Sequence, residues 1–372
     1  MTTAFIVFYG LGGGSDVERR LDAFKVAIGA SVLREARAAG YDPVIAVTTD
    51  AAAAAAFRAA GADLEAGERA PFHFGEELRR VARARSLDRL VVVGAGAGAL
   101  LTADDLRALR AQLDGSRSLV LSNNAYSADI VGLTPASALD AIALPATDNP
   151  LARLLHQQAG LPSVQLPRSA ATLLDVDTPT DATVLLRHPR CPLALHAVGA
   201  WETELGARID ALMRLVTTAE RELLVAGRVG APVWTYLESQ TACRVRMLAE
   251  ERGMAAAGRD ASGEARTALG FLYERTGPRA FFSLLAELGD GMLFDSRVLF
   301  AHLGWRHAAA DRFASDLFRA EAIAPGPLRD FTLAAREAPF PLLLGGHTLV
   351  AGVLWTMVES AWSGHPEERE QP

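Results

Sequence analysis

The sequence predicts a three-layer α/β sandwich with a mainly parallel sheet, followed by a second, all-α domain. Three observations support this prediction. In the first 190 residues, short apolar runs alternate with helical segments, as in parallel strands joined by helices. After about residue 200 the apolar residues recur mostly at helical spacing. The chain has 372 residues and is 50% hydrophobic, which is more than a single core usually holds.

The first predicted strand, residues 4–9, is apolar throughout, as in a strand buried on both faces. It leads into a glycine-rich segment in which Gly10, Gly12 and Gly13 allow backbone N–H groups to approach a phosphate. A helix over residues 17–39 is expected next. Further strands are predicted at 43–48, 90–94 and 118–122, with helices from 51 and 102 between them.

Two carboxylates end this half of the chain. Asp175 and Asp177 lie two residues apart after an apolar run, and in an extended strand alternate side chains share a face. Such a pair can hold a divalent cation. Thr178 and Pro179 then begin a helix, so the acids stand where a strand passes into a helix. The alternative is that Asp175 and Asp177 only cap this turn.

The segment LLDVDTPTDA, residues 173–182, resembles the "DIDTPEDL" close of the nucleotide-binding domain in the GT-A-like nucleotidyltransferase superfamily, especially its 2-phospholactate guanylyltransferase and molybdenum-cofactor nucleotidyltransferase branches. The resemblance covers only the N-terminal half. It implies a fold like that of nucleotide-diphospho-sugar transferases, which binds a nucleoside triphosphate or nucleotide sugar with Mg²⁺. It further implies transfer of a nucleotidyl group to a small phosphorylated acceptor, with Asp175 and Asp177 holding the metal.

The chain departs from this family pattern in two places. The glycine segment contains no cation, and Lys25 lies further downstream, where it is expected to meet the phosphates together with the glycines. Where the family has a metal-binding Asp in a pattern like "ADLPLLT", residues 96–102 read GAGALLT, with Ala97 at the acid's position. One carboxylate fewer weakens a site for a hard cation. Either Asp129, Asp175 and Asp177 carry the metal, or the domain binds a nucleotide without turning it over; a nucleotide-sugar glycosyltransferase is a third reading.

Two further segments are candidates for the same site. Gly75, in the segment 72–77, is expected to let the backbone approach the base or sugar, unless this segment is a helix start whose acids favour the dipole. Asp129 lies where relatives recognise the second substrate, and we expect it to orient the acceptor. Asp129 and Asp177 are therefore the predicted catalytic residues. Asp148 and Asn149 follow in the sequence, and they either line this site or only cap the helix that follows Pro150.

Composition limits the partners. The net charge is −7 and the pI about 5.7, which argues against a broad nucleic-acid surface. Two cysteines form no disulfide framework, and no cationic segment precedes the first apolar run, so a cytoplasmic protein is expected. Residues 340–358 are apolar for about the length of a membrane span, but they contain proline and glycines. We expect a buried helix from near His347, no membrane contact, and a disordered polar tail over 363–372.

The domain boundary is predicted near residues 187–192, where prolines interrupt the chain, and the all-α domain over residues 200–362. This half has polar residues beside apolar ones, and helical spacing places Arg312 next to Asp316. These polar residues have three alternative interpretations: buried Arg–Asp pairs, an Arg-lined anion pocket, or a metal site. The residues concerned are Asp295, Arg297, His302, Asp311, Arg312, Asp316 and His347. If the nucleotide site is degenerate, this domain carries the biological role.

Overall fold

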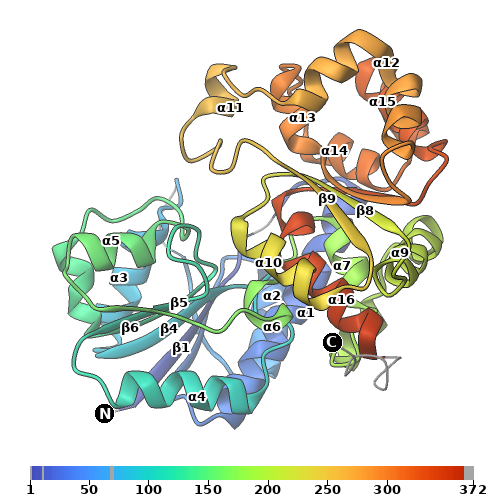
Figure 1. The fold of residues 1–372 in the computed structure, drawn as a ribbon. Coiled ribbons are helices and arrows are strands. Elements are labelled where there is room, and N and C mark those ends of the chain that lie inside the picture. The colour runs from blue at the N-terminus through green and yellow to red at the C-terminus, as the bar shows by residue number, and fades with distance from the viewer. Residues whose placement is uncertain (1, 11, 68–70, 364–372) are drawn as a thin grey trace. The chain divides into compact units, whose positions relative to one another are not determined.

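The computed structural model describes residues 2–10, 12–67 and 71–363, and it divides into two compact units (Figure 1). The first unit comprises Met1–Gly12, Asp22–Asp175 and Pro192–Val198. The second comprises Gly13–Leu21, Val176–Cys191 and Gly199–Pro372. Late in the chain, the backbone therefore passes between units after Asp175, Cys191 and Val198. The boundary predicted near residues 187–192 contains the second of these points and lies between the other two.

The first unit is built on a seven-stranded sheet of order β3-β2-β1-β4-β6-β5-β7. Its strands are β1 (Thr3–Phe8), β2 (Val44–Val47), β3 (Asp63–Glu65), β4 (Arg89–Gly94), β5 (Leu119–Ser122), β6 (Ile130–Thr134) and β7 (Ser163–Gln165). Only β6 among these strands runs antiparallel to its neighbours β4 and β5. The mainly parallel sheet expected from strand–helix alternation is confirmed.

Helices cover both faces of this sheet. They are α1 (Asp16–Ala38), α2 (Ala51–Ala59), α3 (Phe74–Ala84), α4 (Ala103–Asp114), η1 (Ala136–Ala141), α5 (Leu151–Gln157), α6 (Ala170–Leu173) and α8 (Leu193–Val198). On one face, Leu78 of α3 and Leu155 of α5 share a core with Val131 of β6. The next residue, Gly132, faces Leu109 and Leu113 of α4 on the opposite face. Figure 1 shows α3 and α5 across the sheet from α4, which confirms the three-layer sandwich.

The second unit also contains a sheet, so the expectation of an all-α domain after residue 200 is wrong. Four parallel strands in the order β11-β10-β8-β9 form this sheet. They are β8 (Glu222–Gly227), β9 (Arg244–Ala249), β10 (Gly291–Asp295) and β11 (Leu342–Gly345). Three of them are short apolar runs in which leucine is common, such as ELLVAG and LLLG. Runs of this length cannot be distinguished from buried helix by periodicity.

Helices surround this second sheet. They are α7 (Pro179–Leu185), α9 (Glu202–Val216), α10 (Ala231–Gln240), α11 (Arg259–Ser262), α12 (Ala268–Ala286), α13 (Ser296–His302), α14 (Ala309–Asp316), η2 (Ala320–Ala322), α15 (Pro327–Arg336), η3 (His347–Val350) and α16 (Gly352–Ser363). Phe331 of α15 packs against Phe282 of α12 and Phe300 of α13, with ring centroids 5.4 and 5.5 Å apart. An aromatic core therefore joins these three helices.

The apolar tract at residues 340–358 contains three elements rather than the single helix expected. It supplies β11, the short η3 and most of α16, so the α-helix begins at Gly352 and not near His347. The glycines at 345 and 346 end the strand, and α16 is buried along most of its length. None of the described helices has both the length and the apolar character needed to cross a membrane. The predicted disordered tail falls almost wholly outside the described residues.

Candidate functional site

The glycine segment and the late Asp175 lie at the same edge of the first-unit sheet. β1 and β4 run parallel with Phe8 opposite Gly94, and the Ala95 N–H donates to the Phe8 carbonyl at 3.0 Å. Ala97 then forms an isolated bridge with Asp175. The strand order reverses between β1 and β4, since β2 and β3 lie to one side and β6, β5 and β7 to the other. Ligands of open α/β sheets bind at such a point.

Two further acids stand at this edge. Asn123, which follows β5, accepts the backbone N–H groups of Asp129 and Ile130 at 3.0 and 3.2 Å, and its amide donates to an Asp129 carboxylate oxygen at 3.2 Å. Because β6 is antiparallel, its first residues meet the carboxyl ends of β4 and β5. Asp148 is near Gly94: a Cβ atom on Gly94 would lie 3.9 Å from Asp148 Oδ2. The edge therefore gathers Asp129, Asp148 and Asp175.

The amides of the glycine segment already donate to carboxylates. In the first unit, the Gly12 N–H donates to Asp22 Oδ2 at 3.2 Å. In the second unit, the Ser15 N–H donates to Glu18 Oε2 at 3.0 Å, and Gly13 lies beside the same carboxylate. Two N–H groups of the segment are therefore already bonded to carboxylates of α1, and phosphate binding by this segment stays a prediction. Sequence reasoning missed Asp22 and Glu18 because no motif marks an acid that follows such a loop.

Negative charge at this edge also affects Tyr9, the residue after β1. Burial, together with the carboxylates of Asp22 and Asp50, raises the pKa of Tyr9 to about 12. Asp50 caps α2 by accepting the Ala53 N–H at 2.7 Å. Tyr9 is therefore a neutral phenol at physiological pH, and it supplies no proton acceptor to this edge.

The predicted metal pair is divided by the unit boundary. Asp175 belongs to the first unit and Asp177 to the second. Thr178, and not either acid, is the N-cap of α7, and its partner in the capping box is Asp181. Across the described residues, no three His, Cys, Asp or Glu side chains form a group that holds a metal. The acids at the sheet edge fit Mg²⁺ only in its usual form, bound by one or two carboxylates together with the substrate's phosphates and water.

Gly75 contacts protein where a ligand was expected, whereas the part of Lys25 in phosphate binding stays a prediction. The Gly75 N–H donates to the Pro145 carbonyl at 2.9 Å, and a Cβ on Gly75 would lie 2.7 Å from Pro145 Cδ. Gly75 thus allows α3 to pack against this segment, and its amide is not available to a ligand. Lys25 is half-buried on α1.

Sequence reasoning also missed two exposed aromatic rings at this edge. Phe72 lies beside Phe8 at the end of β1 and is 56% exposed. Tyr126 lies in the loop before Asp129 and is 71% exposed.

In the second unit, charged residues follow two of the strands. Arg228, after β8, makes two hydrogen bonds to the fully buried Asp295 at the end of β10, at 2.6 and 3.0 Å. Arg297, in the first turn of α13, makes two with the fully buried Asp316, at 2.8 and 2.5 Å. Buried Arg–Asp pairs were one of the alternatives for this half, and they are present. The partner of Asp316 is Arg297, however, and not Arg312.

The metal site considered as an alternative for this half, from Asp295, His302, Asp311 and His347, does not form among the described residues. His302 accepts the Thr267 N–H at 3.0 Å through Nδ1, and its Nε2 lies 3.5 Å from a Glu274 oxygen. His302 therefore ties α13 to the start of α12. Burial and the Arg228 charge lower the pKa of His347, although Asp295 acts in the opposite direction. His347 is thus a half-buried side chain whose neutral form is favoured.

Comparison with known proteins gives similarity of fold only. No family model matches the chain, and no curated protein does. A solved structure from Desulfovibrio desulfuricans, described as a nucleotide-diphospho-sugar transferase, is 17% identical, covers 50% of this chain and 87% of its own, and has a TM-score of 0.38. A cytidylyltransferase from Leptospira borgpetersenii is 14% identical over 50% of this chain and 86% of its own, with a TM-score of 0.38. A nucleotidyl transferase from Methanothermobacter is 22% identical over 46% of this chain and 91% of its own, with a TM-score of 0.34.

Proposed function

We propose that the carboxyl edge of the first-unit sheet binds a nucleoside triphosphate and transfers its nucleotidyl group to a small phosphorylated acceptor. The observation that carries the proposal is the position of Asp175: it bridges Ala97 just after β4, next to the end of β1, where the strand order reverses. In this reaction an oxygen of the acceptor phosphate attacks the α-phosphorus, and pyrophosphate leaves. The protein contributes mainly by positioning and by stabilising charge.

Several predicted residues of the first unit have a defined part in this proposal. Gly10 and Gly12 supply amides to the phosphates, and Lys25 offsets their charge. Asp129, held by Asn123, orients the acceptor. Asp175 would hold Mg²⁺ together with the triphosphate, and the cation would neutralise part of the phosphate charge.

A second candidate is a nucleotide-binding domain without turnover, and Ala97 favours it. This residue is only 1% exposed and bridges Asp175, so the family's missing carboxylate would stand directly beside Asp175. The two candidates agree on binding and differ on chemistry. Release of pyrophosphate from a bound triphosphate separates them.

The test is calorimetric titration of the full chain with each Mg²⁺–nucleoside triphosphate. We expect one site in the first unit, and a loss of at least tenfold in affinity for Asp175→Asn, because Asn keeps the shape and removes the charge. The exposed Asp104→Asn, on α4, is the matched control and should bind as the wild type does. Binding that is identical in wild type, Asp175→Asn and the control would exclude Asp175 from the site.

The converse variant is Ala97→Asp. Without Mg²⁺, a buried carboxylate beside Asp175 should lower the melting temperature through like-charge repulsion. With Mg²⁺ and nucleotide, the pair gains a shared counter-ion, so the variant should regain stability and bind more tightly than the wild type. If Mg²⁺ and nucleotide do not change the melting temperature of Ala97→Asp, no metal binds at this position.

A further inference from the structure

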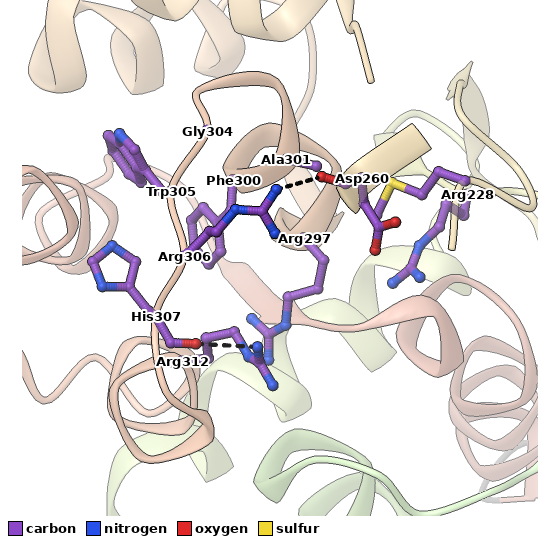
Figure 2. Close-up of a pocket in the computed structure, with 11 residues that line it drawn as sticks. Arg228, Asp260, Arg297, Phe300, Ala301, Gly304, Trp305, Arg306, His307 and Arg312 are labelled. Carbon is purple, nitrogen blue, oxygen red and sulfur yellow. Dashed lines mark hydrogen bonds between the residues drawn. The ribbon is translucent and has the colours of Figure 1, made fainter. Parts of the chain in front are cut away.

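A cavity in the second unit is lined by four arginines. Its volume is about 360 Å³, and it lies beyond the carboxyl ends of β8 and β10. Arg228 follows β8, Arg297 begins α13, Arg306 belongs to the loop after α13, and Arg312 belongs to α14. Figure 2 shows the guanidinium groups of Arg228, Arg297, Arg306 and Arg312 directed toward a common space. Four arginines around one cavity point to an anionic ligand.

Two of these arginines are fixed before any ligand binds. Asp295 holds Arg228 and Asp316 holds Arg297, each through two hydrogen bonds, and both carboxylates are fully buried. The side chains of Arg228 and Arg297 are 16% and 13% exposed. Each Arg has five N–H donors and uses only some of them on its partner. The remaining donors are therefore held in place, which lowers the entropy cost of binding.

The other two arginines, Arg306 and Arg312, form no direct ion pair with a carboxylate among the described residues. Arg312 Nη1 donates to the His307 carbonyl at 3.2 Å, and Arg306 Nη2 donates to the carbonyls of Asp260 and Ala261 at 3.1 and 2.8 Å. A carbonyl accepts a hydrogen bond but does not neutralise a cation. Burial lowers the pKa of Arg312 and the Arg297 charge lowers it further, although the carboxylates of Asp316 and Glu18 act in the opposite direction. An anion between Arg297 and Arg312 would relieve this repulsion.

Apolar side chains complete the wall. Trp305 and Phe300 stack with ring centroids 5.7 Å apart, and Met254 and Ala301 also line the cavity. Such a wall accommodates carbon or ring atoms next to the charged group. The described lining includes one acid, Asp260, whose Oδ1 accepts the Ala261 N–H at 2.8 Å. The arrangement suits a ligand with one strongly charged end and one apolar part.

We propose that this cavity binds a small phosphorylated molecule, with its phosphate among Arg228, Arg297 and Arg312 and its organic part against Phe300 and Trp305. A phosphate monoester carries up to two negative charges and three terminal oxygens, so it can accept from three guanidinium groups at once. A monocarboxylate has one charge and two oxygens and leaves at least one arginine without a counter-ion. The site lies wholly in the second unit and does not depend on the proposed nucleotide site.

Calorimetric titration of the full chain with phenyl phosphate, inorganic phosphate and benzoate tests this proposal. Phenyl phosphate should bind one site, and inorganic phosphate should bind the same site several-fold more weakly because it lacks the ring. Benzoate has the ring but only a carboxylate, and it should bind at least tenfold more weakly than phenyl phosphate. These three probes distinguish an organic phosphate ligand from free phosphate and from a carboxylic acid.

Variants locate the site. Arg312→Gln should weaken phenyl phosphate binding at least tenfold, and Arg306→Gln, at an exposed side chain, should weaken it a few-fold without affecting folding. Arg336→Gln is the control, since Arg336 is in the same unit but pairs with Glu321 at 2.8 Å. Asp175→Asn should bind phenyl phosphate as the wild type does, which separates this site from the nucleotide site. Absence of saturable binding, wild-type affinity in both Arg312→Gln and Arg306→Gln, or benzoate binding as tightly as phenyl phosphate would overturn the proposal.

Discussion

The carboxyl edges of the two sheets differ in charge. In the first unit, this edge carries Asp129, Asp148 and Asp175, and its glycine amides face carboxylates. In the second unit, arginines follow β8 and β10. Parallel strands place ligand sites at the same end in both sheets, but the side chains decide which charge can bind there. An acidic edge needs a cation to bind phosphates, whereas an edge with surplus arginine binds them directly.

The two edges also differ in how deeply their charges are buried. Asp295 and Asp316 are fully buried with arginine partners. Burial disfavours the charged form of Asp295, but Arg228 outweighs it and the pKa of Asp295 is lowered. At the acidic edge, Asp129 and Asp175 are only partly buried. Charge changes should therefore alter folding in the second unit and ligand binding in the first.

The largest effect is expected for Arg297→Met. This change leaves Asp316 buried without its counter-ion, and loss of one partner of a buried pair costs about 3–5 kcal/mol. Denaturant unfolding of the second unit measures it. Arg85→Met in the first unit is the comparison, since Arg85 pairs with Glu65 and Asp63 at a side chain that is 34% exposed. Its cost should stay within about 1 kcal/mol.

A double variant tests whether the unpaired buried charge causes the loss of stability in Arg297→Met. Arg297→Met with Asp316→Leu removes both charges, and it should recover most of the stability lost in Arg297→Met because no uncompensated charge is left. If the double variant is less stable than Arg297→Met alone, packing and not charge is the reason for the loss.

Asp181 gives the next largest effect, and it depends on pH. This carboxyl is fully buried, accepts the N–H groups of Asp177 and Thr178 and the Thr348 hydroxyl, and keeps its Oδ1 unbonded among the described groups. Burial raises its pKa from 3.8 to about 7, against the Thr348 hydrogen bond. Between those pH values the folded chain holds a proton that the unfolded chain has lost. The free energy of unfolding should therefore fall as the pH rises from about 4 to about 7.

The slope of that dependence is the measurement. Each unit of pKa difference corresponds to about 1.4 kcal/mol, so the total is a few kcal/mol. Asp181→Asn keeps the acceptor oxygen for the two N–H groups and removes the titration, so its stability should change less between pH 5 and pH 8. The exposed Asp104→Asn should keep the wild-type slope. Equal slopes in all three proteins would contradict a raised pKa at Asp181.

The sequence predicted the first sheet better than the second for a physical reason. Residues 4–9 and 90–94 are rich in β-branched and aromatic residues, and glycine follows the first run and ends the second, which are strong strand indicators. The strands of the second unit are rich in leucine, which occurs equally in buried helices. Without β8 as a strand, the position of Arg228 at a sheet edge was not predictable. The direction of β6 was not predictable either, because sequence order does not determine strand direction.

The candidate site shows the same division. Asp175 was predicted at the carboxyl edge of the sheet because parallel strands bring their ends together, and the bridge to Ala97 places it at that edge, just after β4. Gly75 was assigned to a ligand because glycine permits close backbone approach, but the approaching group is Pro145. Local sequence identifies a glycine that allows close contact but does not identify what it contacts. Whether Asp177 acts with Asp175 stays a prediction.

The smallest expected effect concerns the acid that occupies the glycine segment. The Gly12 N–H donates to Asp22 Oδ2 at 3.2 Å, so a bound phosphate must displace this carboxylate and accept its repulsion. Asp22→Asn removes the negative charge and weakens the competing hydrogen bond. The affinity for a Mg²⁺–nucleoside triphosphate should then rise a few-fold, about 1 kcal/mol, as expected for one charge-assisted hydrogen bond. Asp104→Asn again provides a change of the same charge away from this loop. A lower affinity in Asp22→Asn would mean that Asp22 takes part in binding, for instance through the cation, and the acidic edge would then be a metal-binding surface and not an obstacle to phosphate.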